Sequence, residues 1–430
     1  MSSTPVQHEW ETVPLRYVCQ LNSSVDFGEF EEDDELTFLP MDRVKSGYFL
    51  PNTDKFSKYA SSYNAFEDGD IVLAKVTPCF ENGNIAVAQN LEGGKGFGSS
   101  ELFVIRPKTV NRKFLFYYFQ SSAFKQDGEA SMTGAGGLKR VSPDLLRQHH
   151  LPCPDNETQR LIAGYLDRET ARIDALVAEK EKMLVLLEEK RAALISRAVT
   201  RGLDPIAPLK PSGLDWLGDI PAHWEVWKLK YVVEKIGSGI TPRGGAESYQ
   251  SEGVPLFRSQ NIHFDGLRMD DIVYVDAETH ESMSNSKVFE GDVLINITGA
   301  SIGRCFYIES LQGEANVNQH VCIVRPAPKI ETKFLYFSLR SDVGQQQIDL
   351  SQSGSGREGL NFESLGNFSI VIPPLSEQLA IIQRLEMADN RSTELLNEIR
   401  NSIERLKERR AAVITAAVTG QIAFEDMKQN

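Results

Sequence analysis

Two long stretches of the chain carry apolar residues at alternating steps of four and three, a pattern typical of a helix that packs against another helix. Each stretch follows a proline-containing segment, LPCPDNETQ at 151–159 and VIPPLSEQ at 371–378. A proline disfavours helix in the residues that precede it in the sequence and permits a helix to start in the residues that follow it. The apolar stripe of the first stretch consists of Ile162, Leu166, Ile173, Leu176, Met183, Leu187 and Leu194. The stripe of the second consists of Ile381, Leu385, Ala388, Leu395, Ile399, Leu406 and Val413.

The two predicted helices share one register, because a shift of 219 residues converts the first stripe into the second. Polar residues such as Glu169, Lys180 and Ser392 interrupt the stripes, so neither helix suits a zipper with a copy of itself. We therefore predict that the helices pair with each other in antiparallel orientation. The stripe residues other than Met183 and Ala388, together with Arg191 and Arg410, are candidates for helix pairing or for binding a partner protein.

The ends of the two helices repeat almost word for word. EKRAALISRAVTRG at 189–202 returns as ERRAAVITAAVTGQ at 408–421, with eight of fourteen positions identical. Further pairs are DGDIVL (68–73) with EGDVLI (290–295), and KFLFYYFQS (113–121) with KFLYFSLRS (333–341). The chain is therefore a tandem duplication.

Each copy begins with short β-like runs separated by Gly- and Asn-rich turns, and then a KFL segment that is typical of a helix. The strand-like runs are IVLAKV (71–76), ELFVIRP (101–107), VLINIT (293–298) and HVCIVRP (320–326). The sequence thus predicts an α/β (α+β) fold in which two similar globules are each followed by a long helix, and the helices form an antiparallel coiled coil. The expected boundaries are 1–154 for the first globule, 155–202 for its helix, 203–222 for a linker, 223–374 for the second globule, 375–420 for its helix and 421–430 for a tail.

Composition agrees with a globular protein, because 41% of the residues are apolar and 25% are charged. No run approaches the ~18 apolar residues of a membrane span, and the first residues do not resemble a signal peptide. We expect a cytoplasmic protein without a membrane partner. The formal net charge of −14 argues against nucleic acid only weakly, because it averages all surfaces and EEDDE at 31–35 contributes five of the negative charges.

The sequence lacks the usual marks of catalysis. It contains no GxxxxGK[ST] phosphate loop, and its single Pro-Pro pair, Pro373-Pro374, lies between Ile372 and Leu375 instead of in an Asn/Asp-Pro-Pro-aromatic loop. The five cysteines are scattered without a CxxC spacing, and no His/carboxylate motif stands out, so we expect no metal site and no disulfide framework. We therefore expect no catalytic residues.

The order of these features resembles the specificity subunit of type I restriction-modification systems. The resemblance rests on the duplication, the helix spacing and the phrases DWLGDIPAHWEVWKLKYV (215–232), PLSEQ (374–378), NITGASIGR (296–304) and RAAVITAAVTG (410–420). It implies that each globule is a target recognition domain that reads one half of a split, asymmetric sequence in double-stranded DNA. It also implies that the helices set the gap between the halves and dock two copies of a DNA adenine methyltransferase subunit, to which restriction subunits can be added. S-adenosylmethionine, ATP and Mg are then expected on those partners, and none on this chain.

Base edges in the major groove are read by Arg and Lys at guanine and by Asn and Gln at adenine, so polar loops are the places to look for specificity. The loops differ between the two copies whereas the helix ends do not, as expected if the helices meet identical partners and the loops read different DNA. The candidate DNA-binding residues are Lys75, Lys139 and Arg140 in the first globule, and Arg243, Arg258, Gln260, Asn261, Arg304 and Arg357 in the second.

Two other classes of protein remain open at this point. A coiled-coil adaptor with two protein-binding domains and no DNA contact fits the acidic charge and the amphipathic helices. A single-chain enzyme fits less well, because no active-site constellation is present. For a DNA specificity subunit, the long helices would act as a ruler: ~40 helical residues at 1.5 Å each span on the order of 60 Å, somewhat under two turns of B-DNA.

Overall fold

A computed structural model describes residues 10–28, 30–31, 33–56, 63–134, 137–242, 244–352 and 359–428. The chain divides into two compact units. Unit 1 comprises Met1–Glu181 and Arg400–Asn430, and unit 2 comprises Lys182–Ile399. Each unit therefore holds one globule and parts of both long helices.

The globule of unit 1 contains two four-stranded sheets, with strand orders β2-β9-β6-β7 and β4-β3-β8-β5. All pairings are antiparallel except that of β3 with β8. The strands are β1 (Thr12–Pro14), β2 (Cys19–Leu21), β3 (Glu35–Leu39), β4 (Thr53–Lys55), β5 (Asn64–Glu67), β6 (Ile71–Ala74), β7 (Ile85–Val87), β8 (Lys95–Gly98), β9 (Leu102–Pro107) and β10 (His150–Pro152). The helices are α1 (Leu15–Val18), α2 (Arg112–Tyr118), α3 (Ser122–Ala130) and α4 (Pro143–Gln148).

The globule of unit 2 repeats this plan with a four-stranded antiparallel sheet of order β14-β22-β19-β20 and a three-stranded sheet of order β18-β15-β21. The strands are β11 (Leu209–Pro211), β12 (Asp219–Pro221), β13 (Glu225–Lys228), β14 (Val233–Ser238), β15 (Val254–Phe257), β16 (Ile262–His263), β17 (Gly266–Leu267), β18 (Val273–Val275), β19 (Val293–Asn296), β20 (Cys305–Tyr307), β21 (Asn316–Val317), β22 (Val321–Pro326) and β23 (Ser369–Ile372). The helices are α6 (Ala277–Ser282), α7 (Thr332–Arg340), α8 (Asp342–Gln352) and α9 (Phe362–Gly366). The mixed α and β content and the KFL helices, α2 and α7, confirm the predicted fold class.

A buried ion pair explains why the DGDIVL phrase is repeated. Asp70 is 1% exposed at the start of β6 and receives two hydrogen bonds of 2.8 Å from Arg106 of β9. Asp292 is 0% exposed at the start of β19 and receives bonds of 2.7 and 2.9 Å from Arg325 of β22. Such bidentate Arg–carboxylate pairs fix the relative position of neighbouring strands. The repeated Asp and Arg are therefore part of the framework of each globule.

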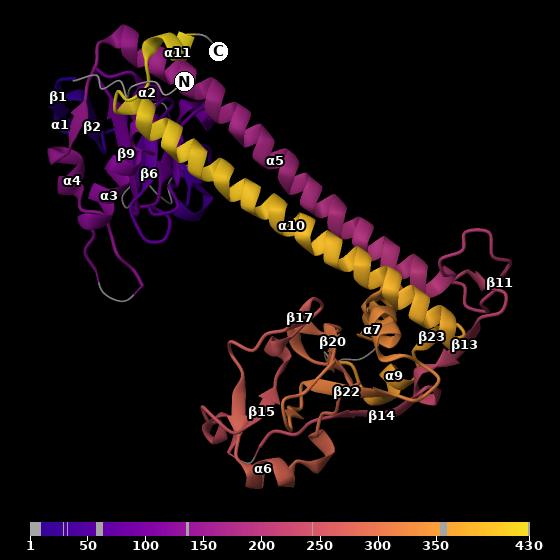
Figure 1. Ribbon diagram of the computed structural model, residues 1–430. Helices are drawn as coiled ribbons and strands as arrows, with labels where there is room; N and C mark the ends of the chain where they lie inside the picture. Colours follow the sequence, from indigo (N-terminus) through magenta and orange to yellow (C-terminus); the bar gives the residue numbers. More distant parts are fainter. Residues whose placement is uncertain are drawn as a thin grey trace. The chain divides into compact units, whose positions relative to one another are not determined.

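The two long helices are α5 (Asn156–Arg201) and α10 (Leu375–Val418), where we expected helices over 155–202 and 375–420. In unit 1, Arg410 Nε donates a hydrogen bond of 2.9 Å to Asp174 Oδ1, and in unit 2, Arg191 Nε donates one of 2.6 Å to Asp389 Oδ1. Residue numbers thus rise along one helix as they fall along the other, and the helices run side by side in Figure 1. The predicted antiparallel pairing is confirmed.

The buried line along each helix departs from the predicted stripe beyond its first turns. Leu176 and Leu395 are 45% and 40% exposed, whereas Leu396 and Ile403 are 2% and 5% exposed. From this point, residues one position later than predicted are also buried or half-buried, namely Val177, Leu184, Ile195, Leu396, Ile403 and Ile414, while the predicted Leu187, Leu194, Ile399, Leu406 and Val413 are only half-buried. The prediction used a spacing of 3.5 residues, but a straight helix has 3.6 residues per turn and drifts by about 20° per heptad.

The duplicated phrase at the helix ends packs against the globules. In unit 2 the end of α5 contributes Ile195, Ala198 and Val199 to the main core, and in unit 1 the end of α10 contributes the equivalent Ile414, Ala417 and Val418. The hydroxyl oxygens of Ser196 and Thr415 accept hydrogen bonds from the first backbone amides of α8 and α3, at 2.9 and 3.0 Å. The phrase occurs twice because each globule binds the end of the helix that comes from the other half of the chain.

A glutamine near the start of each long helix anchors the preceding loop. Gln159 is 2% exposed; its Oε1 accepts a hydrogen bond of 2.7 Å from the amide of Asn111, and its Nε2 donates one of 2.7 Å to the carbonyl of Pro154. Gln378 is 0% exposed and makes the equivalent bonds with the amide of Glu331, at 2.8 Å, and the carbonyl of Pro373, at 2.9 Å. The repeated ETQ and SEQ phrases therefore hold each KFL helix at its amino end.

Two segments carry more structure than expected. The predicted linker 203–222 contains a hairpin of β11 and β12. The predicted tail 421–430 contains a short helix, α11 (Phe424–Lys428), whose Met427 is 0% exposed in the core of unit 1. Both segments cover apolar surface at the ends of the long helices.

Candidate nucleic-acid interface

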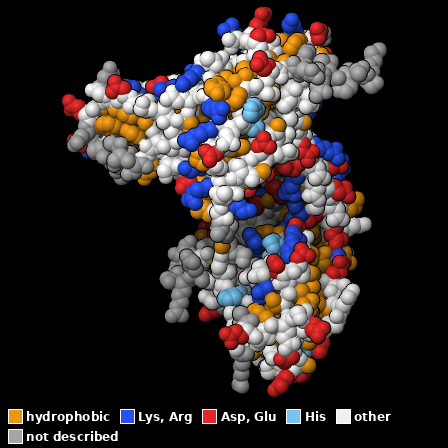
Figure 2. Space-filling model, turned by 90° about the vertical axis from the view of Figure 1, so that its left-hand side faces the viewer, with side chains coloured by type: hydrophobic (Ala, Val, Ile, Leu, Met, Phe, Trp, Pro, Cys, Tyr) orange, Lys and Arg blue, Asp and Glu red, His pale blue; other side chains and the backbone are white. Residues whose placement is uncertain are grey.

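A basic cleft of about 630 Å³ lies in unit 1 between the strand β2 and the helix α4. Four of its lining residues are cationic, namely Arg16, Lys75, Lys108 and Arg147, and no described lining residue is acidic. The upper part of Figure 2 shows unit 1 from the side that carries β1, α1 and α4, where Lys and Arg side chains gather. Four cations around one hollow create a positive potential that attracts phosphate, in spite of the acidic chain as a whole.

The cleft contains no group suited to nucleophilic chemistry among its described residues. Its one thiol, Cys19, is 7% exposed, and burial raises the pKa of this thiol to about 12. A thiol with so high a pKa stays protonated at neutral pH and is a poor nucleophile. The cleft is therefore equipped to bind an anion.

A cation beside an exposed tyrosine marks the rim of this cleft and recurs in unit 2. The guanidinium of Arg16 lies 4.9 Å from the centre of the Tyr17 ring, and the ammonium of Lys230 lies 5.3 Å from that of Tyr231. The two tyrosines are 63% and 65% exposed. A cation and an aromatic face together suit the phosphate and sugar of a nucleic acid, which are the same at every base pair.

The corresponding cleft of unit 2 differs in charge. It has a volume of about 390 Å³ between β14 and α9, and its charged residues are Lys230, Glu234, Lys235 and Glu363. Lys235 donates a hydrogen bond of 2.6 Å to the carbonyl of Asn285, and burial lowers its pKa. The two clefts therefore occupy matching places with different chemistry.

The predicted residues of the first globule lie in two loops that the structure joins. The Thr77 hydroxyl donates to the carbonyl of Gly137 at 2.8 Å and accepts from the amide of Lys139 at 3.0 Å. Lys75 is half-buried with its ammonium 5.6 Å from the centre of the Phe103 ring, and Lys139 is exposed. Both cations can therefore act at one surface.

Arg140 is tied to a neighbour instead of being free. Its guanidinium donates two hydrogen bonds of 3.0 Å to the carboxylate of Glu101. The hydrogen bond from Arg140 lowers the pKa of Glu101, and the charge of Lys75 acts in the same direction. DNA could use Arg140 only in competition with Glu101.

In the second globule, the loops around residues 258–261 and 299–304 are joined by Asn296, which is 0% exposed. Its amide nitrogen donates to the carbonyl of Ser259 at 2.8 Å and to the hydroxyl of Ser301 at 3.1 Å. Gln260, in the first of these loops, is exposed, and Arg304, at the end of the second, is half-buried. Gln260 and Arg304 thus remain candidates for DNA contact on adjoining loops.

Asn261 has a different role from the one we predicted. It is 0% exposed, its Oδ1 accepts from the amide of Arg258 at 2.9 Å, and its Nδ2 donates to the carbonyl of Arg268 at 2.8 Å. A side chain that is buried with its amide bonded on both sides cannot reach a base edge. Asn261 instead shapes the loop. We predicted a DNA contact because an asparagine amide can pair with adenine. The sequence of the loop does not show that packing buries Asn261.

Arg258 already has partners within the protein. Its guanidinium donates a hydrogen bond of 2.6 Å to the carbonyl of Asp271 and lies 5.6 Å from the centre of the Tyr249 ring. Arg243 and Arg357 lie outside the described residues. Sequence reasoning missed Arg16, Lys108 and Arg147, which line the basic cleft. The repeated LRY and LKY triplets were the available signal for Arg16, but they lie outside the loops that differ between the copies.

The long helices present apolar side chains to solvent. In unit 2, Met183, Val185 and Leu186 of α5 are 51%, 58% and 54% exposed, and Leu379, Met387 and Leu395 of α10 are 54%, 62% and 40% exposed. A contiguous exposed apolar patch marks a site of protein interaction, and these six side chains are candidates for such a patch. Within the described residues, no helix has the length and apolar character needed to cross a membrane.

Among the predicted stripe residues, the structure buries Ile162, Leu166 and Ile173 in unit 1, and Ile381 and Leu385 in unit 2. Half-buried positions are Leu187, Arg191, Leu194, Ile399, Leu406, Arg410 and Val413. The exposed Leu176 and Leu395 lie off the buried line and remain candidates for partner contact.

Comparison with protein families matches residues 7–184 and 221–405 to the type I restriction modification DNA specificity domain. One curated relative is the type I restriction enzyme EcoEI specificity subunit of Escherichia coli, 21% identical over 88% of this chain and 77% of the relative. Another is the MjaVIII specificity subunit of Methanocaldococcus jannaschii, 22% identical over 99% of this chain and 96% of the relative.

Two solved structures share the fold. The first comes from work on complex assembly and conformational transition of the type I R-M system; it has a TM-score of 0.71 and 19% identity, over 98% of this chain and 100% of that one. The second is the HsdS subunit from Thermoanaerobacter tengcongensis, with a TM-score of 0.51 and 19% identity, over 96% of this chain and 97% of that one.

Proposed function

Because this chain belongs to the type I restriction modification DNA specificity family, we propose that it is the DNA-recognition subunit of a type I restriction-modification complex. Each globule reads one half of a split, asymmetric target in double-stranded DNA. The chain itself performs no catalysis and binds none of the cofactors of the methylation and restriction reactions. S-adenosylmethionine, ATP and Mg belong to its partners, which are two methyltransferase subunits and added restriction subunits.

The observation that carries this proposal is the contrast between framework and loops in the two globules. The buried pairs Asp70–Arg106 and Asp292–Arg325 and the anchoring Gln159 and Gln378 are equivalent in both copies. At the loops the copies diverge. Two readers built on one framework with different loops suit a target whose two halves differ in sequence.

Surface residues that are equivalent in the two globules and surface residues that occur in only one globule contact different parts of the DNA. The matched pairs Arg16–Tyr17 and Lys230–Tyr231 suit the DNA backbone, which is chemically uniform. Lys139 in the first globule, and Gln260 and Arg304 in the second, suit base edges because they have no common counterpart, whereas Lys75 lies at the basic cleft and close to the loop of Lys139. Specificity therefore resides in loops, and affinity in the shared positions.

The apolar side chains exposed along α5 and α10 support docking of methyltransferase subunits on the helices. The net charge of −14 suits an arrangement in which these partners supply many of the phosphate contacts. The methyltransferase subunits would also hold the flipped adenine. The isolated chain should consequently bind DNA weakly and with a shallow dependence on salt. The lengths of α5 and α10 set the gap between the half-sites.

The decisive experiment is co-expression of this chain with its methyltransferase subunit in a host without DNA methylation, followed by mapping of modified adenines. We expect one asymmetric motif of two short parts with a fixed gap. Expression of either subunit alone should leave the DNA unmodified. Methylation at a continuous site, or at the same site without this chain, would contradict the proposal.

A further inference from the structure

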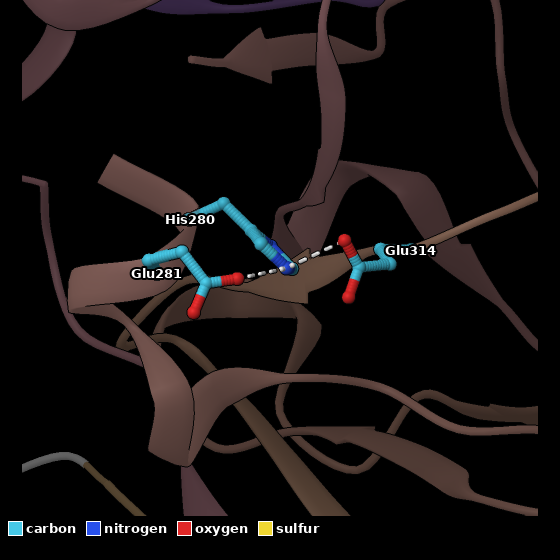
Figure 3. Close-up of side chains that lie close together, drawn as sticks. All are labelled: His280, Glu281 and Glu314. Atoms are coloured by element: carbon cyan, nitrogen blue, oxygen red, sulfur yellow. Dashed lines mark ion pairs between the residues drawn. The ribbon is translucent and has the colours of Figure 1, made fainter. Parts of the chain in front are cut away.

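A buried histidine in unit 2 faces two carboxylates from different segments. His280 and Glu281 lie on α6, and Glu314 lies two residues before β21. Figure 3 shows the His280 ring nitrogen directed toward the carboxylates of Glu281 and Glu314. One ligand atom from each of the three residues lies within 4.8 Å of the others. We expected no metal site because the sequence contains no His/carboxylate motif, and Glu314 lies 34 residues after His280 along the chain.

The hydrogen bonds around His280 place its proton on Nδ1. Nδ1 lies 2.5 Å from Oδ1 of Asn316, which is 0% exposed. The orientation of this amide is set by its nitrogen, which donates to the carbonyl of Met283 at 3.3 Å and to the Ser286 hydroxyl at 2.8 Å. The oxygen of Asn316 can only accept, so His280 Nδ1 donates. In the neutral ring, the other nitrogen, Nε2, then carries a lone pair.

This lone pair points at other acceptors. His280 is 1% exposed, and its Nε2 has no hydrogen-bond partner. It lies 3.1 Å from Glu314 Oε2 and 3.8 Å from Glu281 Oε1. Three electron-rich atoms that face one another are unfavourable unless a cation lies between them. Lys287 neutralises part of this charge from outside the cluster, with its ammonium 2.9 Å from Glu281 Oε1 and 3.7 Å from Glu314 Oε1.

We propose that His280, Glu281 and Glu314 form a binding site for a divalent transition-metal ion of the zinc class. Ligand atoms at ~2.1 Å from a tetrahedral zinc lie about 3.4 Å apart, close to the two distances from Nε2. A histidine ligand whose other nitrogen donates to a fixed acceptor is the usual arrangement at protein metal sites, and Asn316 provides that acceptor. Water completes the coordination, because three protein groups leave at least one position open.

The ion would tie α6 to the strand β21. Asn316 of β21 pairs with Leu256 of β15, and β15 leads directly into the loop that carries Gln260. The metal therefore stiffens the sheet beneath one of the candidate DNA loops, while lying outside the clefts and loops assigned to DNA. The proposal goes beyond the DNA-recognition function and is tested independently of it.

The test is binding of Zn²⁺ and Co²⁺ to the full chain after removal of metal with a chelator. Wild-type protein should bind one Zn²⁺ ion. The variants Glu314→Gln and Glu281→Gln should each bind Zn²⁺ at least about tenfold more weakly, because each lacks one ligand. Both carboxylates are largely exposed, with side chains 64% and 71% accessible, so these variants should fold. Glu278→Gln, on the exposed side of the same helix, is the matched control and should bind like wild type.

Two further readouts separate a real site from loose binding. Zn²⁺, but not Mg²⁺, should raise the melting temperature of wild type and of Glu278→Gln, and Co²⁺ should give the visible absorption of a nitrogen- and oxygen-ligated ion. Lys287→Met should tighten Zn²⁺ binding at least about threefold by removing a competing charge, a gain that misfolding cannot produce. Equal Zn²⁺ binding by all variants, or none by wild type, would overturn the proposal and leave a proton as the cation on Nε2.

Discussion

Arg191 of α5 and Asp389 of α10 form an ion pair of 2.6 Å within unit 2, and Arg340 of α7 joins it at 3.1 Å from the same carboxylate. Arg410, the counterpart of Arg191 in the repeat, instead pairs with Asp174 at 2.9 Å within unit 1. The duplication has kept the arginine and changed the position of its acidic partner. The two pairs also differ in exposure, since the side chain of Asp389 is 20% exposed and that of Asp174 is 54% exposed.

Asp389→Asn should destabilise unit 2 by about 2–3 kcal/mol at neutral pH, because two guanidinium groups lose a largely buried partner. Burial by itself would raise the pKa of Asp389, but the hydrogen bond from Arg191 and the charges of Arg340 and Arg191 outweigh it and lower the pKa. A lowered folded pKa stabilises the protein above the unfolded pKa of about 3.9, and the effect is lost as the pH falls through the folded value. Melting curves from pH 7 to pH 3 should show the difference from wild type shrinking below about pH 4. Asp174→Asn, at the exposed pair, should cost no more than about 1 kcal/mol.

Substitution of Gln159 by Leu should destabilise unit 1, and Gln378→Leu should destabilise unit 2. Each change leaves a partly buried backbone amide and a buried carbonyl without their partner, at a cost of about 1–3 kcal/mol. Hydrogen exchange should accelerate at the start of α2 in the first variant and at the start of α7 in the second, because Asn111 and Glu331 cap those helices. Gln383→Leu, at an exposed position of α10, should change neither. Acceleration at both helix starts in one variant would contradict independent anchors.

Arg16→Ala and Lys230→Ala should weaken DNA binding by the complex with methyltransferase without changing which sequence is preferred. Loss of one phosphate contact reduces the slope of log affinity against log salt by about 1. Filter binding or anisotropy over a salt series, with cognate and altered targets, measures both properties. Lys55→Ala is a suitable control, because its ammonium is already paired with Asp33 at 2.8 Å. A shift in the preferred bases would mean that these residues read sequence.

Lys139→Ala should alter recognition of one half of the target only. Lys139 lies in a loop joined to Thr77 in unit 1, and a lost base contact costs about 1–3 kcal/mol at its own position. Methylation mapped across a library of randomised sites would reveal relaxed preference in that half and none in the other. Equal relaxation in both halves would show that the two globules do not read DNA separately.

Removal of seven residues from each long helix should shorten the gap in the target by about three base pairs. Seven residues correspond to about 10 Å of helix, and DNA rises by about 3.4 Å per base pair. Deletion of 179–185 from α5 and 397–403 from α10 removes facing segments and nearly preserves the side of each helix that is buried. The methylated motif should keep both halves with a smaller gap. A motif with its original gap would exclude the helices as the ruler.

Much of the fold could be predicted from the order of residues alone. Strand and helix patterns depend on neighbours within a few positions, so the runs at 71–76 and 101–107 became β6 and β9, and the KFL segments became α2 and α7. The duplication and the common register of the helices are also properties of the linear sequence, and they were enough to predict antiparallel pairing. The family followed from the same repeated phrases.

Contacts between residues far apart in the chain could not be predicted in this way. The drift of a 3.6-residue helix decided that Leu396 and not Leu395 is buried. Packing made Asn261 a loop-shaping residue with no exposed surface, although its loop looked suited to reading bases. The meeting of His280 with Glu314 depends on how α6 lies against the segment before β21. The sequence by itself determined the elements, their duplication and their pairing, because these arise from local periodicity; only the tertiary structure decided which polar side chains are buried in the framework and which remain available to bind, because burial depends on distant partners.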